Sequence, residues 1–126
     1  MSYLLDTHAL LWYLFDKTQL SVDVSRIIEN EDKLYLSIVS LWEIAIKQSI
    51  GKLNISKTIL QIEEQCNKSD IQILPILPIH CEKIKELEKI HNDPFDRMII
   101  SQAIVDGITI LTKDNNIQKY KVDTLW

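Results

Sequence analysis

The chain has 126 residues, of which 46% are hydrophobic and 25% charged, a composition typical of a single globular domain over residues 1–126. Its two glycines and two cysteines exclude a glycine-rich phosphate-binding loop and a disulfide scaffold. The net charge of −4 argues against a broadly basic nucleic-acid-binding surface, although four acids gathered around cations would account for the whole excess. No apolar stretch is long enough to span a membrane and no signal peptide is recognisable, so we expect a cytoplasmic protein.

The first half of the chain alternates short apolar runs with amphipathic segments. We expect strands over residues 3–5 and 33–37, and helices over 7–15, 21–30 and 40–50. Ser40 and Glu43 have the spacing of a capping box that would begin the third of these helices, and Gly51 would end it.

The second half continues the alternation. We expect helices over residues 56–68, from 78 to about 92, and over 95–105, and strands over 71–76, 108–111 and within 119–126. Asp93 and Pro94 form a cap followed by proline at the first helical position, and Gly107 would end that helix. Short strands alternating with helices predict an α/β fold around a parallel sheet that is covered on both faces.

Four acids stand out, because each follows a predicted strand or lies on a mainly apolar helix: Asp6, Glu43, Asp96 and Asp114. Burying an unpaired carboxylate is costly, and converging carboxylates repel one another unless a cation lies between them. Oxygen ligands suit Mg²⁺ or Mn²⁺ better than Zn²⁺, and the sequence has no His/Cys cluster that would favour zinc. In open parallel sheets, ligands bind beyond the carboxyl ends of the strands, which is where Asp6 and Asp114 are expected.

With these four acids in this sequence order and the expected strands and helices between them, the whole chain resembles the PIN-domain family, and specifically its VapC-like toxins. In that family the first acid follows the first strand, the second lies on a helix after Ser or Thr, the third opens the central helix, and the fourth ends a Thr-x-Asp pattern. The matching residues are Asp6, Ser40 with Glu43, Asp96, and Thr112 with Asp114.

The resemblance implies a PIN-like three-layer sandwich, with a short parallel β-sheet flanked by helices on both faces. It implies that the four acids are catalytic and hold Mg²⁺ or Mn²⁺, with Asp6 and Asp96 as the strongest candidates for direct ligands. Glu43 and Asp114 would bind the metal directly or through water. Three hydroxyls would orient these carboxylates: Thr7, Ser40 and Thr112.

The activity implied by the resemblance is metal-dependent endoribonuclease cleavage, in which a metal-activated water attacks a phosphodiester and leaves 5′-phosphate and 3′-hydroxyl ends. The implied partners are an RNA substrate and a cognate antitoxin, and the implied assembly is a homodimer. DNA would be contacted only through the antitoxin, and no membrane is involved.

Each acid also has a purely structural interpretation. Asp6 could cap the first helix, Glu43 could close the capping box with Ser40, Asp96 could favour the helix dipole, and Asp114 could occupy a turn. Each of these interpretations is the more common one for a single acid. Four such acids at ends expected to face one cleft favour a functional site.

The neighbours of the acids are assigned more modest roles. Asp93 is interpreted as a helix cap, and His8 and His91 as outer-shell or surface residues. We expect Arg97 to pair with a nearby acid, with phosphate contact as the alternative, and His80 to lie on the surface at a helix start.

Trp12 and Trp42 are large enough to favour the core, with an antitoxin contact as the alternative. Cys81 is interpreted as a small core residue, and Lys47 as part of a solvated face.

Two other functions are considered. A catalytically inactive PIN module that only binds protein or RNA is the main alternative, and the presence of all four acids counts against it. A hydrolase of small phosphorylated substrates is disfavoured, because the chain has no glycine-rich phosphate loop. The sequence does not indicate which RNA would be cut, or whether one or two metals would act.

Overall fold

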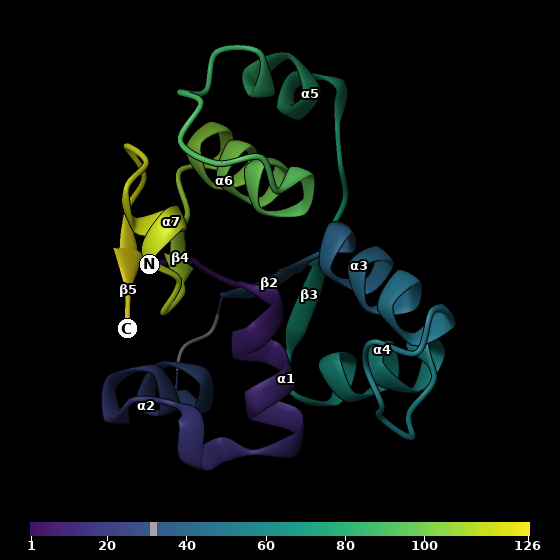
Figure 1. Cartoon of the computed structure of the whole chain (residues 1–126). Helices are drawn as coiled ribbons and strands as arrows, with labels where there is room; N and C mark the ends of the chain where they lie inside the picture. Colours follow the sequence, from purple (N-terminus) through teal and green to yellow (C-terminus); the bar gives the residue numbers. More distant parts are fainter. Residues whose placement is uncertain (31–32) are drawn as a thin grey trace.

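The computed structural model describes residues 1–30 and 33–126, which form a parallel sheet surrounded by helices (Figure 1). The strands are β1 (Tyr3–Leu5), β2 (Leu34–Ser37), β3 (Ile71–Leu74), β4 (Thr109–Leu111) and β5 (Thr124–Leu125). The helices are α1 (Thr7–Phe15), the 3₁₀ turn η1 (Lys17–Gln19), α2 (Val22–Asn30), α3 (Ile38–Ser49), α4 (Ile59–Lys68), α5 (Pro78–Ile84), α6 (Pro94–Asp106) and α7 (Asn115–Gln118).

The five strands are all parallel and lie in the order β3-β2-β1-β4-β5. The first strand is therefore central, and the chain builds outward from it first through β2 and β3 and later through β4 and β5. The order reverses between β1 and β4, where Leu5 is in register with Leu111. In open parallel sheets such a reversal opens a crevice at the carboxyl edge, which is where ligands bind.

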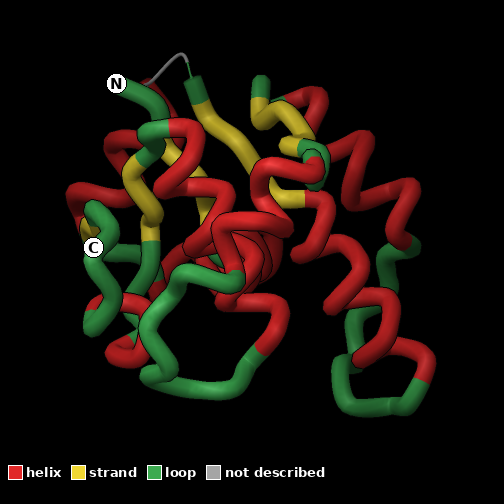
Figure 2. The backbone as a smooth tube through the Cα atoms, turned by 90° about the horizontal axis from the view of Figure 1, so that it is seen from above, coloured by secondary structure: helices red, strands yellow, loops and turns green. Residues whose placement is uncertain are grey.

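Helices cover both faces of the sheet, which confirms the predicted three-layer sandwich (Figures 1 and 2). Side chains alternate between the faces: Tyr3 and Leu5 pack in a core with α1, α2 and α4, whereas Leu4 packs in a second core with α6 and α7. In Figure 1, α1, α2 and α4 lie on one side of the strands, and α5 and α6 lie on the other. Because both faces are buried at its centre, the central strand β1 is wholly apolar, whereas the outer strand β3 carries the exposed Gln72.

The predicted caps of α1 and α6 are present. Asp6 accepts a hydrogen bond from the Ala9 amide at the start of α1, and Asp93 accepts from the Phe95 and Asp96 amides at the start of α6. Gly107 ends α6 with φ of 66°, a left-handed conformation that glycine adopts without strain. These local signals were sufficient to place both helices in the sequence.

Several predictions of detail were wrong. The cap of α3 is Ser37, whose hydroxyl accepts from the Val39 amide, so Ser40 and Glu43 do not form a capping box. Helix α5 ends at Ile84, well short of residue 92, although the apolar side chains beyond it still pack on the core. The short helix α7 was not predicted. It begins directly after Asp114, which caps it.

For two residues of α5 the predicted burial was wrong. His80 is fully buried, whereas Cys81 is exposed. Nδ1 of His80 accepts from the Leu77 amide at 2.9 Å, and Nε2 lies 3.2 Å from the Asp106 carboxylate. A polar side chain can be buried when both of its polar atoms have partners, and no periodicity in the sequence shows such partners.

No helix in the described part of the chain is both long enough and apolar enough to span a bilayer.

Candidate active site

Asp6 and Asp114 lie beside one another because they follow adjacent parallel strands. The Asp6 amide hydrogen-bonds to the Leu111 carbonyl at 3.2 Å, which ties the end of β1 to the end of β4. Thr112 connects the two acids: its hydroxyl donates to Asp6 Oδ2 at 2.5 Å and accepts from the Asp114 amide at 3.0 Å. The Thr112 hydroxyl was expected to orient a carboxylate. It contacts the side-chain carboxylate of Asp6 and the backbone amide of Asp114.

Asp6 is a helix cap and a member of the acidic cluster at the same time. Its Oδ1 accepts from the Ala9 amide at 2.7 Å, and the residue is only 5% exposed. Burial raises the pKa of Asp6 above its usual value, against the lowering effect of the hydrogen bonds from Thr112 and Ala9. The charge of Asp114 raises it further, which shows that the two carboxylates are within electrostatic range.

Glu43 reaches the same edge of the sheet from α3 and is also only 5% exposed. The Thr7 hydroxyl donates to its Oε1 at 2.8 Å and lies 2.9 Å from the Ser40 hydroxyl. Lys47, one helical turn later, donates to Oε2 at 2.7 Å. We expected Lys47 on a solvated face, although its spacing of four residues from Glu43 is the signal for such a pair.

Asp96 lies in the first turn of α6, and its Oδ2 is 3.1 Å from Nε2 of His91. Burial raises its pKa to about 6, against the lowering effect of the His91 hydrogen bond. The charges of Asp93, Asp114 and Glu43 raise the pKa further. Asp93 lies at the start of the same helix, whereas Asp114 and Glu43 come from two other segments of the chain, so Asp96 lies within electrostatic range of an acid that follows β4 and of an acid on α3.

Asp114 is partly buried and accepts from the amides of Asn116 and Ile117, at 2.7 and 3.3 Å. As with Asp6, its structural role as a cap coexists with its place beside the other acids. A cap uses one carboxylate oxygen and leaves the other for a second partner, so the two interpretations do not exclude each other.

Neighbouring residues depart from expectation in two places. Arg97 donates to the Glu88 carbonyl at 2.8 Å and to the Tyr120 hydroxyl at 3.0 Å, whereas we expected it to pair with an acid. Trp42 is 59% exposed and packs edge-on against Phe95, so the prediction that it belongs to the core was wrong.

A cavity of about 330 Å³ opens beside Asp6 and Asp114 and is also lined by His8, Trp12 and Lys113. The His8 ring stacks on Trp12 with centroids 5.6 Å apart, and the Lys113 ammonium lies 5.9 Å from the centre of the indole. Flat rings and a cation therefore flank two of the acids.

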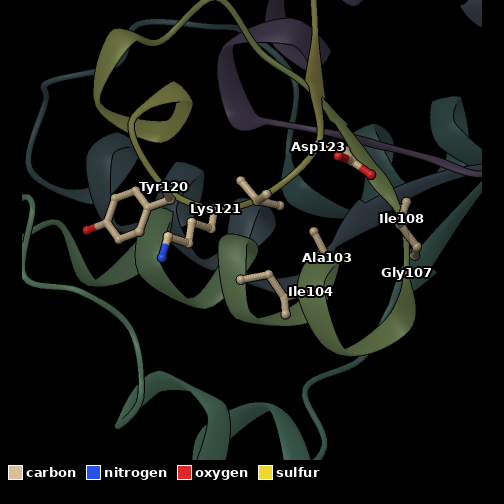
Figure 3. A pocket seen from close by; sticks show the side chains of 8 residues that line it. Ala103, Ile104, Gly107, Ile108, Tyr120, Lys121 and Asp123 are labelled. Carbon is tan, nitrogen blue, oxygen red and sulfur yellow. The ribbon is translucent and has the colours of Figure 1, made fainter.

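A second hollow, of about 470 Å³, lies between the carboxyl-terminal half of α6 and the segment that follows α7 (Figure 3). Polar groups, among them Lys121 and Asp123, share its lining with apolar side chains, and it contains none of the four acids.

The chemistry of the clustered donors fits Mg²⁺ or Mn²⁺, because all four acids supply oxygen ligands and two of them have raised pKa values. Among residues 1–30 and 33–126, however, no three Asp, Glu, His or Cys side chains are arranged as a ready-made metal site. Mg²⁺ commonly binds through one or two carboxylates and keeps several waters, so the donor set suits a cation whose shell is completed largely by water.

The raised pKa values predict that the metal-free protein gains stability as the pH falls. The pKa of Asp96 is about 6 in the folded chain against an ordinary 3.8, so its contribution is fully present below 3.8 and is lost as the pH rises through 6. Asp6 acts in the same direction. We expect Asp96→Asn to exceed the parent in unfolding free energy by roughly 1–2 kcal/mol at pH 8, after discounting for partial exposure, and by less at pH 5.

Urea denaturation of both proteins in EDTA at pH 5 and pH 8 measures this difference. A constant offset between the parent and Asp96→Asn at the two pH values would contradict the prediction, because only a group whose ionisation is coupled to folding makes the offset depend on pH.

Comparisons with known proteins identify the family and the fold. Residues 3–123 match the family described as the PIN domain. The chain is 25% identical over 119 residues to "Ribonuclease VapC22" of Mycobacterium tuberculosis, covering 94% of this chain and 91% of that protein.

Two solved structures share the fold. The DNA-bound VapBC2 of Rickettsia felis has a TM-score of 0.70, 17% identity, and coverage of 99% and 98% of the two chains. The DNA-bound VapBC of Salmonella typhimurium has a TM-score of 0.71, 15% identity, and coverage of 99% and 97%. Because the family match spans nearly the whole sequence, this chain belongs to the PIN-domain family.

Proposed function

We propose that this chain is a divalent-cation-dependent endoribonuclease and the toxin of a toxin–antitoxin pair. The observation that carries the proposal is the gathering of four acids, from four separate segments, at the carboxyl edge of the sheet where the strand order reverses. The similarity to a protein named ribonuclease over 94% of the chain supports it.

In this proposal Asp6 and Asp96 hold the cation, Mg²⁺ or Mn²⁺, and Glu43 and Asp114 hold it directly or through water. When bound, the cation supplies an activated water and neutralises charge on the phosphodiester, which gives 5′-phosphate and 3′-hydroxyl ends. The raised pKa values of the buried Asp6 and the partly buried Asp96 support the assignment, because a cation at this position would offset the cost of burying both carboxylates and their repulsion by neighbouring acids.

The hydroxyls around the acids fix the direction in which the carboxylates point. Thr112 holds one oxygen of Asp6 while the Ala9 amide holds the other, so this carboxylate cannot rotate freely. Thr7 and Lys47 hold the two oxygens of Glu43 in the same way. Partners of this kind orient ligands before the cation and substrate arrive, so the ordering entropy is already lost on folding.

The cavity beside Asp6 favours a nucleic acid over a small phosphorylated molecule. Its Trp12 and His8 rings are suited to stacking with an unpaired base, and the ammonium of Lys113 is suited to a backbone phosphate. RNA is cut at a phosphodiester flanked by bases, so a stacking surface next to the acids supports the proposal of an RNA substrate.

The proposed partners are a cognate antitoxin and a second copy of this chain, with DNA contacted only through the antitoxin. The support is the shared fold with chains of two VapBC assemblies bound to DNA, together with the exposure of Trp42, an aromatic type enriched at interfaces.

The experiment that tests the function uses purified, antitoxin-free protein and a pool of structured and single-stranded RNAs, with Mg²⁺ or Mn²⁺ and an EDTA control. We expect cleavage that requires the cation and leaves 5′-phosphate ends, which can be recognised by ligation. If folded, cation-loaded protein cuts no RNA, the chain is instead a PIN module that only binds.

A further inference from the structure

Four polar side chains form a continuous series of hydrogen-bond contacts that ends at Asp96. Arg97, Tyr120, His91 and Asp96 are joined in that order by contacts of 3.0, 2.8 and 3.1 Å. Tyr120 lies in the segment that follows α7, 24 positions from Asp96 in the sequence, and it is only 5% exposed. Figure 3 shows its ring at one end of the hollow beside α6, with the hydroxyl directed away from Ala103 and Ile104.

The hydrogen-bonding capacity of the Tyr120 hydroxyl decides which way the bonds run. A phenol has one hydrogen to donate and two lone pairs that accept. The guanidinium of Arg97 has no acceptor and can only donate, so it occupies one lone pair, and the His91 amide, 3.4 Å away, approaches the other. The phenol hydrogen is then available for Nδ1 of His91 at 2.8 Å, since the other acceptor within reach, the His91 carbonyl, is 3.5 Å away.

This direction of donation fixes the state of the His91 imidazole. When Nδ1 accepts from Tyr120, a neutral imidazole carries its hydrogen on Nε2. Nε2 then donates to Oδ2 of Asp96 at 3.1 Å. The opposite tautomer would aim a lone pair at the carboxylate and give the phenol oxygen three donors for two lone pairs.

We propose that Tyr120, held by Arg97, locks His91 in the Nε2–H tautomer and thereby makes His91 the positioning residue of the Asp96 carboxylate. This inference rests on the proposed function, in which Asp96 holds the cation. The hydrogen bond from His91 occupies Oδ2 and fixes the rotation of the carboxylate, so the approach of the other oxygen is set before a cation binds.

The same chain of bonds connects the last part of the sequence to the site. Tyr120 packs in the core with Ile99, Ile100 and Ile117, so the ring is held by apolar contacts as well as by its hydroxyl. Arg97 is held in turn by the Glu88 carbonyl at 2.8 Å. The hydroxyl is therefore a fixed donor in a rigid setting, as an orienting group requires.

The first test is Tyr120→Phe, which keeps the buried ring and removes only the hydroxyl. Long-range ¹H–¹⁵N NMR of the metal-free protein, at a pH where the imidazole is neutral, reports which nitrogen carries the hydrogen. We expect a single Nε2–H tautomer of His91 in the parent and a mixture in Tyr120→Phe. Tyr13→Phe, which removes a hydroxyl that bonds to Ser69, is the matched control and should leave His91 unchanged.

The second test measures the affinity for Mn²⁺ by titration calorimetry. We expect Tyr120→Phe to weaken binding by about 10-fold and His91→Ala by 10- to 100-fold, because partners of metal ligands have effects of this size. His91→Gln, whose amide can also donate to Asp96, should recover part of the loss. Adding Tyr120→Phe to His91→Ala should cause no further loss, because the tyrosine acts only through the histidine.

An unchanged His91 tautomer in Tyr120→Phe would overturn the proposal, and so would equal Mn²⁺ affinities in all variants or a parent that binds no Mn²⁺. These readouts are separate from RNA cleavage. If the tautomer and the Mn²⁺ affinity change as expected but the parent cuts no RNA, the positioning of Asp96 by Tyr120 and His91 is supported and the proposed nuclease function fails.

Discussion

Replacing Asp96 by asparagine is expected to lower the rate of cation-dependent RNA cleavage by roughly 100-fold or more. Removing even the partner of a metal ligand costs about 10- to 100-fold in affinity or activity, so removing a proposed ligand should cost at least the upper figure. Asparagine keeps the volume and can still accept from Nε2 of His91, so the helix start and the surrounding contacts should survive. The measurement is the initial rate of cleavage at saturating Mg²⁺ or Mn²⁺.

Asp23→Asn provides the matched control. Asp23 undergoes the same chemical change on the surface of α2, where its side chain is 68% exposed and pairs weakly with Arg26 at 3.8 Å. We expect parental rates from this variant. Parental cleavage by folded Asp96→Asn would show that the acid is structural and would remove it from the proposed cation site.

Replacing His80 by alanine is expected to lower the unfolding free energy by roughly 2–4 kcal/mol. The side chain is fully buried, and its loss leaves a cavity, an unpaired Leu77 amide and an Asp106 carboxylate without its partner. Because α5 packs mainly on α6, the loss also weakens the contact between these two helices. Urea denaturation at neutral pH measures the change.

His80→Asn separates the polar contribution from the cavity. The asparagine oxygen can take the place of Nδ1 and accept from Leu77, so we expect a smaller loss than in the alanine variant. Glu82→Ala, at an exposed position of the same helix, should change the free energy by less than about 0.5 kcal/mol. If all three variants matched the parent, His80 would contribute nothing to joining α5 and α6.

The acidic cluster places stability and proposed activity in opposition. Asp96→Asn is expected to be more stable than the parent at pH 8 in EDTA, yet far less active with a cation. Burial and the charges of Asp93, Asp114 and Glu43 raise the pKa of Asp96, which means that its ionised form is disfavoured in the fold. Ionisable groups whose charged form destabilises the fold are characteristic of functional sites.

The fold class and the positions of the four acids in it followed from the sequence because they depend on local signals. Helix starts at Asp6 and Asp93 and the stop at Gly107 are determined by residues within one turn of each end, and the structure has them where expected. The apolar strands between helices predicted a parallel sheet covered on both faces, since only such a sheet buries every side chain of its strands. The place of Asp6 directly after a strand was part of the same pattern.

Other features depend on contacts between segments far apart in the chain. The cap of α3 shifted from Ser40 to Ser37 because the strand β2 runs directly into the helix, and Ser40 instead lies 2.9 Å from Thr7. His80 was expected on the surface, because its partners, the Leu77 amide and Asp106, are paired with it only once α5 lies on α6. A local pattern cannot reveal a polar side chain that is buried by distant partners.

The surroundings of the acids were likewise decided by tertiary structure. The sequence by itself selected four carboxylates as candidates and predicted the elements that carry them, since residue type and periodicity are local properties. Only the packed chain decided that Thr112 holds Asp6, that Thr7 holds Glu43, and that Tyr120 acts on Asp96 through His91. The physical reason is that a hydrogen bond requires two atoms within about 3 Å of each other, and the sheet order, not sequence separation, sets which residues meet at its carboxyl edge.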